Sequence, residues 1–161
     1  MFNLTIDRFV SGQAEAMINR SLTEVYDIVA NKYFTNYSKW CHEIIELDEI
    51  SIGPIRSGTQ GCQTTRNRGV DCYSTFEVSE FNQNKNLEIK GVSESFRSTY
   101  DFSNNEIGGT RLNYRFELGD LDLSMLPFRS ILNDAINDGA EETVANIKNL
   151  IESPIDLINF H

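Results

Sequence analysis

Residues 128–152, FRSILNDAINDGAEETVANIKNLIE, are the stretch that decides the fold. Apolar side chains recur in it at spacings of three and four residues, which is the pattern of one side of an α-helix. At 1.5 Å per residue, a helix of about 25 residues is roughly 37 Å long, enough to cross a whole sheet. Pro127 and Ser153-Pro154 flank it, where proline is compatible with the ends of a helix. The apolar positions are Phe128, Ile131, Leu132, Ala135, Ile136, Gly139, Ile147, Leu150 and Ile151.

Short segments of alternating apolar and polar residues precede this helix. Turn-forming residues separate them, among them Gly53-Pro54, Arg68-Gly69 and Gly108-Gly109. This pattern predicts a meander of antiparallel hairpins. The segments are residues 42–51, 58–66, 70–81, 86–95, 96–103 and 110–118.

The chain begins with a further strand and two short helices. Residues 13–19 alternate as a half-buried strand does. Ser21 and Glu24 then form a capping box, in which each side chain satisfies a backbone amide at the start of a helix. The aromatic residues 31–40 are consistent with a second short helix or turn at one end of the core.

Alternation also predicts which side of each strand is covered. The opposite side carries charged residues such as Glu88, Arg97 and Arg115, as expected for an antiparallel sheet that is packed on one face only. The residues predicted to face inward are Val70, Cys72, Phe76, Val78, Leu87, Ile89, Phe96, Tyr100, Phe102, Leu112, Tyr114, Phe116 and Leu118.

Composition limits the classes of function. The 161 residues, 40% of them apolar, suit a single α+β domain over residues 1–161. A net charge of −10 with scattered Arg and Lys argues against nucleic acid and anionic membranes as partners. No stretch has the length of a membrane span or the pattern of a signal peptide, so we expect a cytoplasmic protein.

The cysteines and histidines give no sign of a metal site or another cofactor. Cys41, Cys62 and Cys72 are odd in number and lack CxxC spacing, so free thiols are expected. Cys62 and Cys72 are expected to lie almost opposite one another across the hairpin around Arg68-Gly69. They are either two buried thiols or a redox pair.

The order of strand, two short helices, six-strand meander and long final helix resembles the helix-grip fold of the START/Bet v 1-like (SRPBCC) superfamily. Within it, the chain is most similar to the polyketide cyclase/dehydrase and lipid transport branch. The likeness rests on Ile18-Asn19 at the end of the first strand, the capped helix SLTEVYDIVAN, the stretch from Tyr37 to Trp40 and the turn from Gly53 to Gly58. It implies a curved sheet of about seven strands around the long helix.

The resemblance also implies a ligand. Family members bind sterols, lipids, polyketides, hormones or quinones between sheet and helix, and only some are catalysts, with no universal catalytic motif. A hydrophobic or amphipathic small molecule is therefore the expected partner, in a monomer or homodimer. The residues expected to line the cavity are Trp40, Cys72, Phe76, Ile89, Ser98, Tyr100, Tyr114, Phe128, Leu132 and Ile136.

Three interpretations remain open. The middle of the long helix carries small side chains, which favour a cavity beside it, at Ala135, Gly139 and Ala140. A filled core is the alternative. Trp40 and His42 suit the mouth of a pocket. An enzyme of the aromatase/cyclase or dehydratase type needs an ionisable group in the cavity, so it matters whether Glu88, Glu94, Arg97 or His42 turns inward. A protein that binds partners through its surface would instead show no cavity.

Overall fold

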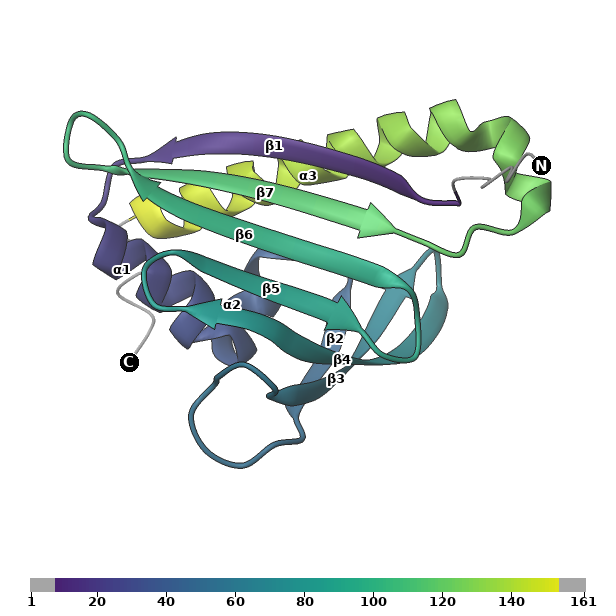
Figure 1. Ribbon diagram of the computed structural model, residues 1–161, viewed down its shortest axis with the longest axis horizontal. Coiled ribbons are helices and arrows are strands. Elements are labelled where there is room, and N and C mark those ends of the chain that lie inside the picture. Colours follow the sequence, from purple (N-terminus) through teal and green to yellow (C-terminus); the bar gives the residue numbers. More distant parts are fainter. Residues whose placement is uncertain (1–7, 154–161) are drawn as a thin grey trace, which may run out of the picture.

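The computed structural model describes residues 8–153, and its centre is one antiparallel sheet (Figure 1). The strand order is β1-β7-β6-β5-β4-β3-β2, so every strand after β1 pairs with its neighbour in sequence, and β7 returns to pair with β1. The predicted meander is confirmed. The strands are β1 (Val10–Ile18), β2 (Ile44–Glu49), β3 (Gln60–Asn67), β4 (Val70–Asn82), β5 (Asn86–Gly91), β6 (Phe96–Asn104) and β7 (Thr110–Leu118).

Two short helices follow β1, as predicted. α1 (Leu22–Tyr26) begins where the sequence indicates, because the backbone N–H of Glu24 donates to the Ser21 hydroxyl at 3.3 Å. The chain then forms one π-helical turn, η1 (Asp27–Asn31), and continues into α2 (Tyr33–Trp40). Tyr26, Tyr33 and Trp40 are buried, so these helices fill one end of the concave side of the sheet.

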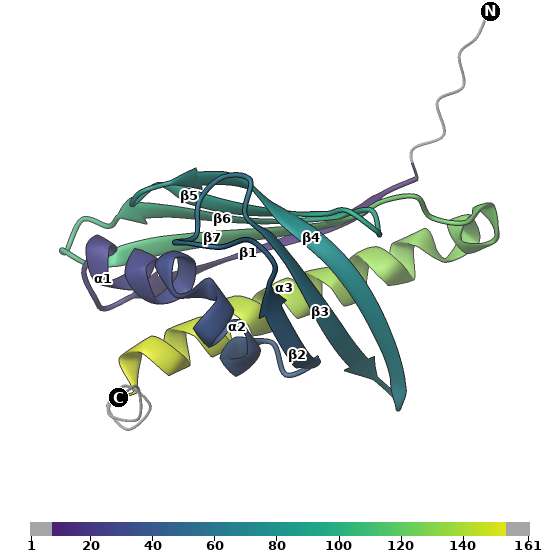
Figure 2. The same cartoon turned by 90° about the horizontal axis from the view of Figure 1, so that it is seen from below.

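The long final helix begins one residue later than its apolar pattern suggests. α3 spans Arg129–Glu152, and the residues before it form a 3-10 helix, η2 (Leu123–Phe128). Pro127 lies inside this tighter turn. Only the second half of α3 is buried, at Ala140, Val144, Ile147, Leu150 and Ile151. The first half lies along β1, and only its start extends past the end of that strand (Figure 2).

α3 lies along β1, which is an edge strand of the sheet. Asn133 and Asn137 accept hydrogen bonds from the backbone N–H groups of Ser11 and Gln13 at 3.2 and 3.1 Å. Further along, Lys148 donates to the Met17 carbonyl. These side chains satisfy backbone groups that the edge of a sheet otherwise leaves unpaired.

Gly12 allows the close approach of β1 and α3. A Cβ atom at this position would lie 2.6 Å from the Asn137 backbone nitrogen and 2.7 Å from the Ile136 carbonyl. Both contacts are with helix backbone, which cannot turn aside as a side chain can. Glycine is therefore required here by the packing and not by the backbone angles.

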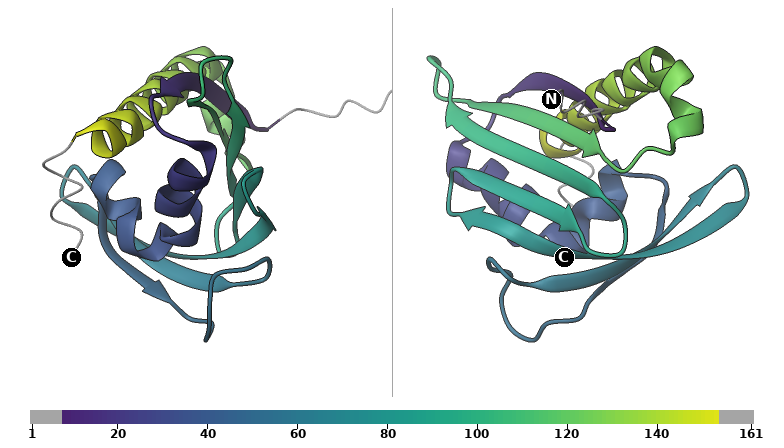
Figure 3. Two further views of the ribbon diagram at one scale, coloured as in Figure 1. Left: turned by 90° about the vertical axis from the view of Figure 1, so that its left-hand side faces the viewer. Right: turned by 45° about the vertical axis from the view of Figure 1, so that its right-hand side comes forward.

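The sheet curls around the helices, so that β2 and β3 face across the interior toward α2 and α3 (Figure 3). The α+β helix-grip fold predicted from the sequence is confirmed. Phe76, Val78, Leu87, Ile89, Tyr100, Phe102, Leu112 and Tyr114 are buried on the inner side. On the outer side, Arg97 and Glu88 form an ion pair at 2.8 Å, so neither turns inward.

The prediction that Val70 and Cys72 are covered is wrong. Val70 is 67% exposed and Cys72 is exposed as well. Both share the inward parity of Phe76 and Val78, but the end of the β3–β4 hairpin extends past everything that packs on the sheet. Alternation indicates the side of a strand and cannot indicate where its cover ends.

The predicted pairing of Cys62 with Cys72 is also wrong. Cys62 lies opposite Thr75, and Cys72 lies opposite Thr65. The hairpin turns at Arg68 and Gly69, both with positive φ, and this turn sets the register of the two strands. The three cysteines are free thiols.

Candidate functional site

A cleft of about 400 Å³ lies between the first half of α3, the end of α2 and the inner side of the sheet. The apolar part of its lining includes aromatic side chains from α2, β6 and β7, with aliphatic residues from α3. The volume falls within the range of small-molecule pockets. The aromatic lining residues are Tyr37, Trp40, Phe96, Tyr114 and Phe116.

Small residues on α3 leave the space open. Ala135, Gly139 and Ala140 all line the cleft, and a Cβ atom at Gly139 would meet nothing within 4 Å. The cleft therefore lies beside the part of the helix that carries small side chains. On the same face of α3, Ile136 adds an apolar side chain, and Thr143 lies one turn beyond Gly139.

Buried hydroxyl groups form the inner part of the cleft. Ser74, Ser98 and Tyr114 are at most 7% exposed, and the Tyr114 hydroxyl donates to Ser98 Oγ at 3.5 Å. Burial raises the pKa of Tyr114 to about 12. The phenol is thus protonated at neutral pH and can donate a hydrogen bond.

Trp40 provides an unused donor beside these hydroxyls. Its side chain lines the cleft and is 2% exposed, and its indole nitrogen has no hydrogen-bond partner among the described residues. Burial raises the pKa of Tyr100, and a hydrogen-bonding interaction with the nearby Trp40 side chain opposes part of that rise. The distance and angle between the two groups are not those of a formed hydrogen bond, so the indole N–H counts as unpaired. An unpaired buried N–H costs about 1–3 kcal/mol, which an acceptor on a bound molecule would relieve.

Carboxylates stand at the outer rim. Glu43, Glu94 and Glu142 line the cleft and are exposed, and the Cys72 thiol donates to Glu94 Oε1 at 3.2 Å. Of the four acid or base candidates named from the sequence, Glu94 and His42 line the cleft, and Glu43 and Glu142 add two carboxylates that were not expected there. Cys41 also lines it, but burial raises the pKa of its thiol, which makes it a poor nucleophile.

The residues expected to line the cavity are spread over three environments. Trp40, Ser98, Tyr114 and Ile136 line the cleft. Phe76, Ile89 and Tyr100 are packed in the core beside α1 and α2, at most 1% exposed. Cys72, Phe128 and Leu132 lie outside the lining, and Phe128 is 53% exposed.

Sequence reasoning missed the polar face of the helix. Glu142, Thr143 and Asn146 line the cleft together with Ile136 and Gly139. Ile136, Gly139, Thr143 and Asn146 follow one another at three- and four-residue spacing, and Glu142 lies three residues after Gly139. Helical periodicity could therefore have found them if polar residues had been counted as well as apolar ones. Asn146 also donates to the Trp40 carbonyl at 3.1 Å, which joins α3 to the end of α2.

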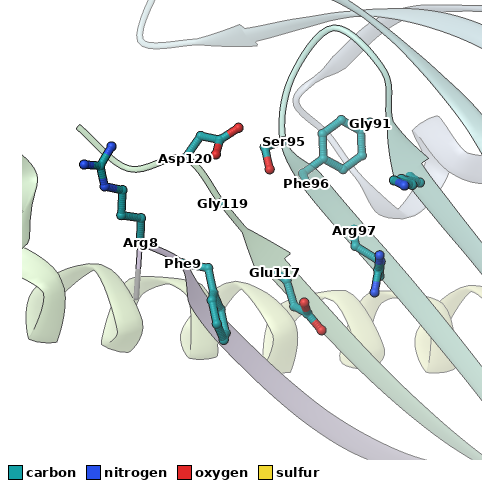
Figure 4. A pocket seen from close by; sticks show the side chains of 10 residues that line it. Arg8, Phe9, Gly91, Ser95, Phe96, Arg97, Glu117, Gly119 and Asp120 are labelled. Atoms are coloured by element: carbon teal, nitrogen blue, oxygen red, sulfur yellow. The ribbon is translucent and has the colours of Figure 1, made fainter. Parts of the chain in front are cut away.

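A second depression, of about 350 Å³, lies near the start of β1 and the end of β7 (Figure 4). Charged side chains surround it, among them Arg8, Arg97, Glu117 and Asp120. Arg97 is already paired with Glu88, and Glu117 with Arg115. We regard the first cleft as the candidate site, because it combines an apolar lining with buried donors.

Residues 8–153 contain neither a cluster of metal ligands nor a helix that could span a membrane. No group of three or more His, Cys, Asp or Glu side chains is placed to hold a metal ion. In the same part of the chain, no helix combines the length and the apolar character needed to cross a membrane.

Comparison with known proteins agrees with this architecture. The family model for polyketide cyclase / dehydrase and lipid transport matches residues 10–152. The chain belongs to this family. No curated protein sequence matches it.

Solved structures share the fold at low sequence identity. A protein of unknown function, SA2116 from Staphylococcus aureus, is 14% identical with a TM-score of 0.72, over 92% of this chain and 97% of that one. The protein Ara h 8.0201 is 10% identical with a TM-score of 0.64, over 90% of this chain and 99% of that one. The di-domain ARO/CYC protein StfQ of the steffimycin biosynthetic pathway is 12% identical with a TM-score of 0.72. The match covers 92% of this chain and 52% of StfQ.

Proposed function

We propose that the protein binds a hydrophobic or amphipathic small molecule, of the lipid, polyketide or quinone type, in the cleft between α3 and the sheet. One observation carries the proposal: an apolar cleft is lined by Trp40, whose buried indole N–H has no hydrogen-bond partner among the described residues. The ligand would bury its apolar body against the aromatic side chains, at about 25 cal/mol per Å². A carbonyl or hydroxyl oxygen on it would accept from Trp40 or Tyr114.

Family membership and shared fold support the same proposal. The chain belongs to a family described by polyketide cyclisation, dehydration and lipid transport, and StfQ is an aromatase/cyclase from a polyketide pathway. Both concern molecules that are largely apolar and carry oxygen acceptors.

A fluorescent probe and a pair of variants test the proposal. N-phenyl-1-naphthylamine is neutral and becomes bright in apolar surroundings, and Trp40 is the only tryptophan of the chain, so its emission reports directly on the cleft. We expect the probe to bind and to quench Trp40. Gly139→Phe should abolish binding, because its ring would fill open space beside the cleft.

Ala145→Phe is the matched control. Ala145 is exposed on the same helix and lies outside the cleft lining, so this variant should bind the probe as the unaltered protein does. Equal binding by both variants would place the probe elsewhere and would overturn the proposal. If instead only Gly139→Phe loses the probe, mass spectrometry under native conditions, on protein from its source cells, would identify the natural ligand as a bound mass.

A cyclase or dehydratase reaction is the second candidate, and the presence of Glu94 and His42 in the lining favours it. Such a reaction needs an acid or base within reach of the ligand. In that case Glu94→Gln or His42→Ala would retain a bound precursor that differs in structure from the molecule held by the unaltered protein. Identical bound molecules in all three proteins would favour simple binding.

A further inference from the structure

Carboxylates outnumber every other ionisable group at the rim of the cleft. Glu43, Glu94 and Glu142 are exposed there beside one histidine, His42, and the described lining residues include no lysine or arginine. The net charge of the chain is −10 with both histidines counted neutral, so the field of the whole molecule has the same sign. A carboxylate, sulfonate or phosphate on a ligand would meet repulsion without a compensating partner.

Polarity changes along the depth of the cleft. Its buried polar groups are all neutral: the Trp40 indole and the Tyr114 phenol donate, and Ser74, Ser98 and Gln63 can both donate and accept. Its exposed charged groups are carboxylates, which accept hydrogen bonds and cannot donate them. A molecule that satisfies both ends carries an oxygen acceptor inside and a donor, best a cation, outside.

The aromatic lining strengthens this preference independently of the carboxylates. The aromatic side chains of Tyr37, Trp40, Phe96 and Phe116 line the cleft. A cation near the face of such a ring is attracted by the negative potential above the ring, and an anion is repelled. The cleft thus combines aromatic rings and carboxylates, as sites for organic ammonium groups do.

We infer that the ligand is an amphiphile with a basic nitrogen, which is protonated and lies at the mouth among Glu43, Glu94 and Glu142 while the apolar body enters the cleft. This inference rests on the proposed binding function and specifies its ligand class. Fatty acids and other anionic amphiphiles are excluded as good ligands on the same grounds.

A matched series of naphthalenes tests the inference. 2-Naphthylmethylamine, 2-naphthalenemethanol and 2-naphthoate present the same ring system with a cationic, neutral or anionic group. Calorimetric titration of the unaltered protein at low salt should give an affinity for the amine about tenfold above that for the alcohol, with the carboxylate weakest. The preference should shrink at 0.5 M NaCl, because the rim charges are exposed to screening.

Neighbouring positions on α3 provide the control variants. Glu142→Gln should lower the affinity for the amine about two- to fivefold and leave the alcohol unchanged. Glu141→Gln removes the same charge from an exposed position outside the lining and should change neither. Glu43→Gln, with Glu46→Gln as its control, repeats the comparison on the other side of the mouth.

The outcomes separate this inference from the proposed function. If the alcohol binds and the amine shows no advantage, or if Glu142→Gln and Glu141→Gln behave alike, the ligand class is wrong although the cleft binds apolar molecules. If none of the three compounds binds and N-phenyl-1-naphthylamine also fails, the binding function and the ligand class both fall.

Discussion

Gly139 occupies a helical position where a side chain would meet open space. Glycine in the interior of a helix costs about 1 kcal/mol relative to alanine. Gly139→Ala should therefore raise the free energy of unfolding by about 1 kcal/mol, measured as a higher midpoint in urea with an unchanged slope. A lower midpoint would mean that the backbone at Gly139 is held in a conformation that alanine resists.

The burial of individual residues was predicted well for the strand positions that the helices cover. Phe76, Ile89 and Tyr100 are buried as their alternation predicts, because strand geometry fixes the side on which each residue lies. Their role was harder to predict, since a filled core and a cavity wall use the same residue types. The division between Tyr100, in the core, and Tyr114, in the cleft, depends on where α2 ends, and no local pattern contains that information.

The contact between α3 and β1 is the element-scale feature with the clearest energetic prediction. Removing the side-chain acceptor in Asn137→Ala leaves the Gln13 N–H without its partner and should cost about 1 kcal/mol. Alanine also favours the helix, so the effect must be measured against Asn149→Ala, an exposed position on the same helix without such a bond.

Asn137→Asp provides the rescue for this comparison, because aspartate keeps an oxygen at the same place. Its unfolding free energy should lie closer to that of the unaltered protein than the value for Asn137→Ala does. If Asn137→Ala and Asn149→Ala unfold at the same urea concentration, the hydrogen bond to β1 contributes nothing and packing against Gly12 alone holds the helix.

Element boundaries were predictable where a cap or a turn marks them. Ser21 starts α1 as expected, and Arg68-Gly69 forms the turn between β3 and β4. The apolar spacing extended α3 back to Phe128, which lies instead in the 3-10 turn that contains Pro127. Hydrophobic periodicity does not distinguish the first residues of an α-helix from a tighter turn that precedes it.

Across the whole molecule, the concave side is filled at one end and open at the other. α1 and α2 carry Tyr26, Tyr33 and Trp40 into the filled end, whereas the first half of α3 offers small residues to the open end. The sequence predicts both halves of the helix as one amphipathic stripe. It cannot predict that only the second half carries buried side chains, because that depends on how far the sheet curls.

Buried tyrosines of the core and of the cleft also make the whole protein sensitive to alkaline pH. Burial raises the pKa values of Tyr33, Tyr37 and Tyr100, and it raises that of Tyr114 to about 12, whereas an unfolded tyrosine has a pKa of about 10. A group whose pKa is higher in the folded state contributes stability that is complete below pH 10 and is lost as the pH rises toward 12. For Tyr114 alone the loss by pH 12 is about 2–3 kcal/mol, since one pKa unit is worth about 1.4 kcal/mol.

Tyr114→Phe should consequently reduce the loss of unfolding free energy between pH 10 and 12 by about that amount. At pH 7 it should cost little, because the hydroxyl makes only a long hydrogen bond to Ser98. Urea unfolding at several pH values measures the slope, and absorbance at 295 nm follows ionisation of the tyrosines. Tyr73→Phe is the control, because Tyr73 is 64% exposed. A slope that Tyr114→Phe leaves unchanged would mean that water reaches the Tyr114 hydroxyl through the cleft, which would then be a wetter site than its apolar lining implies.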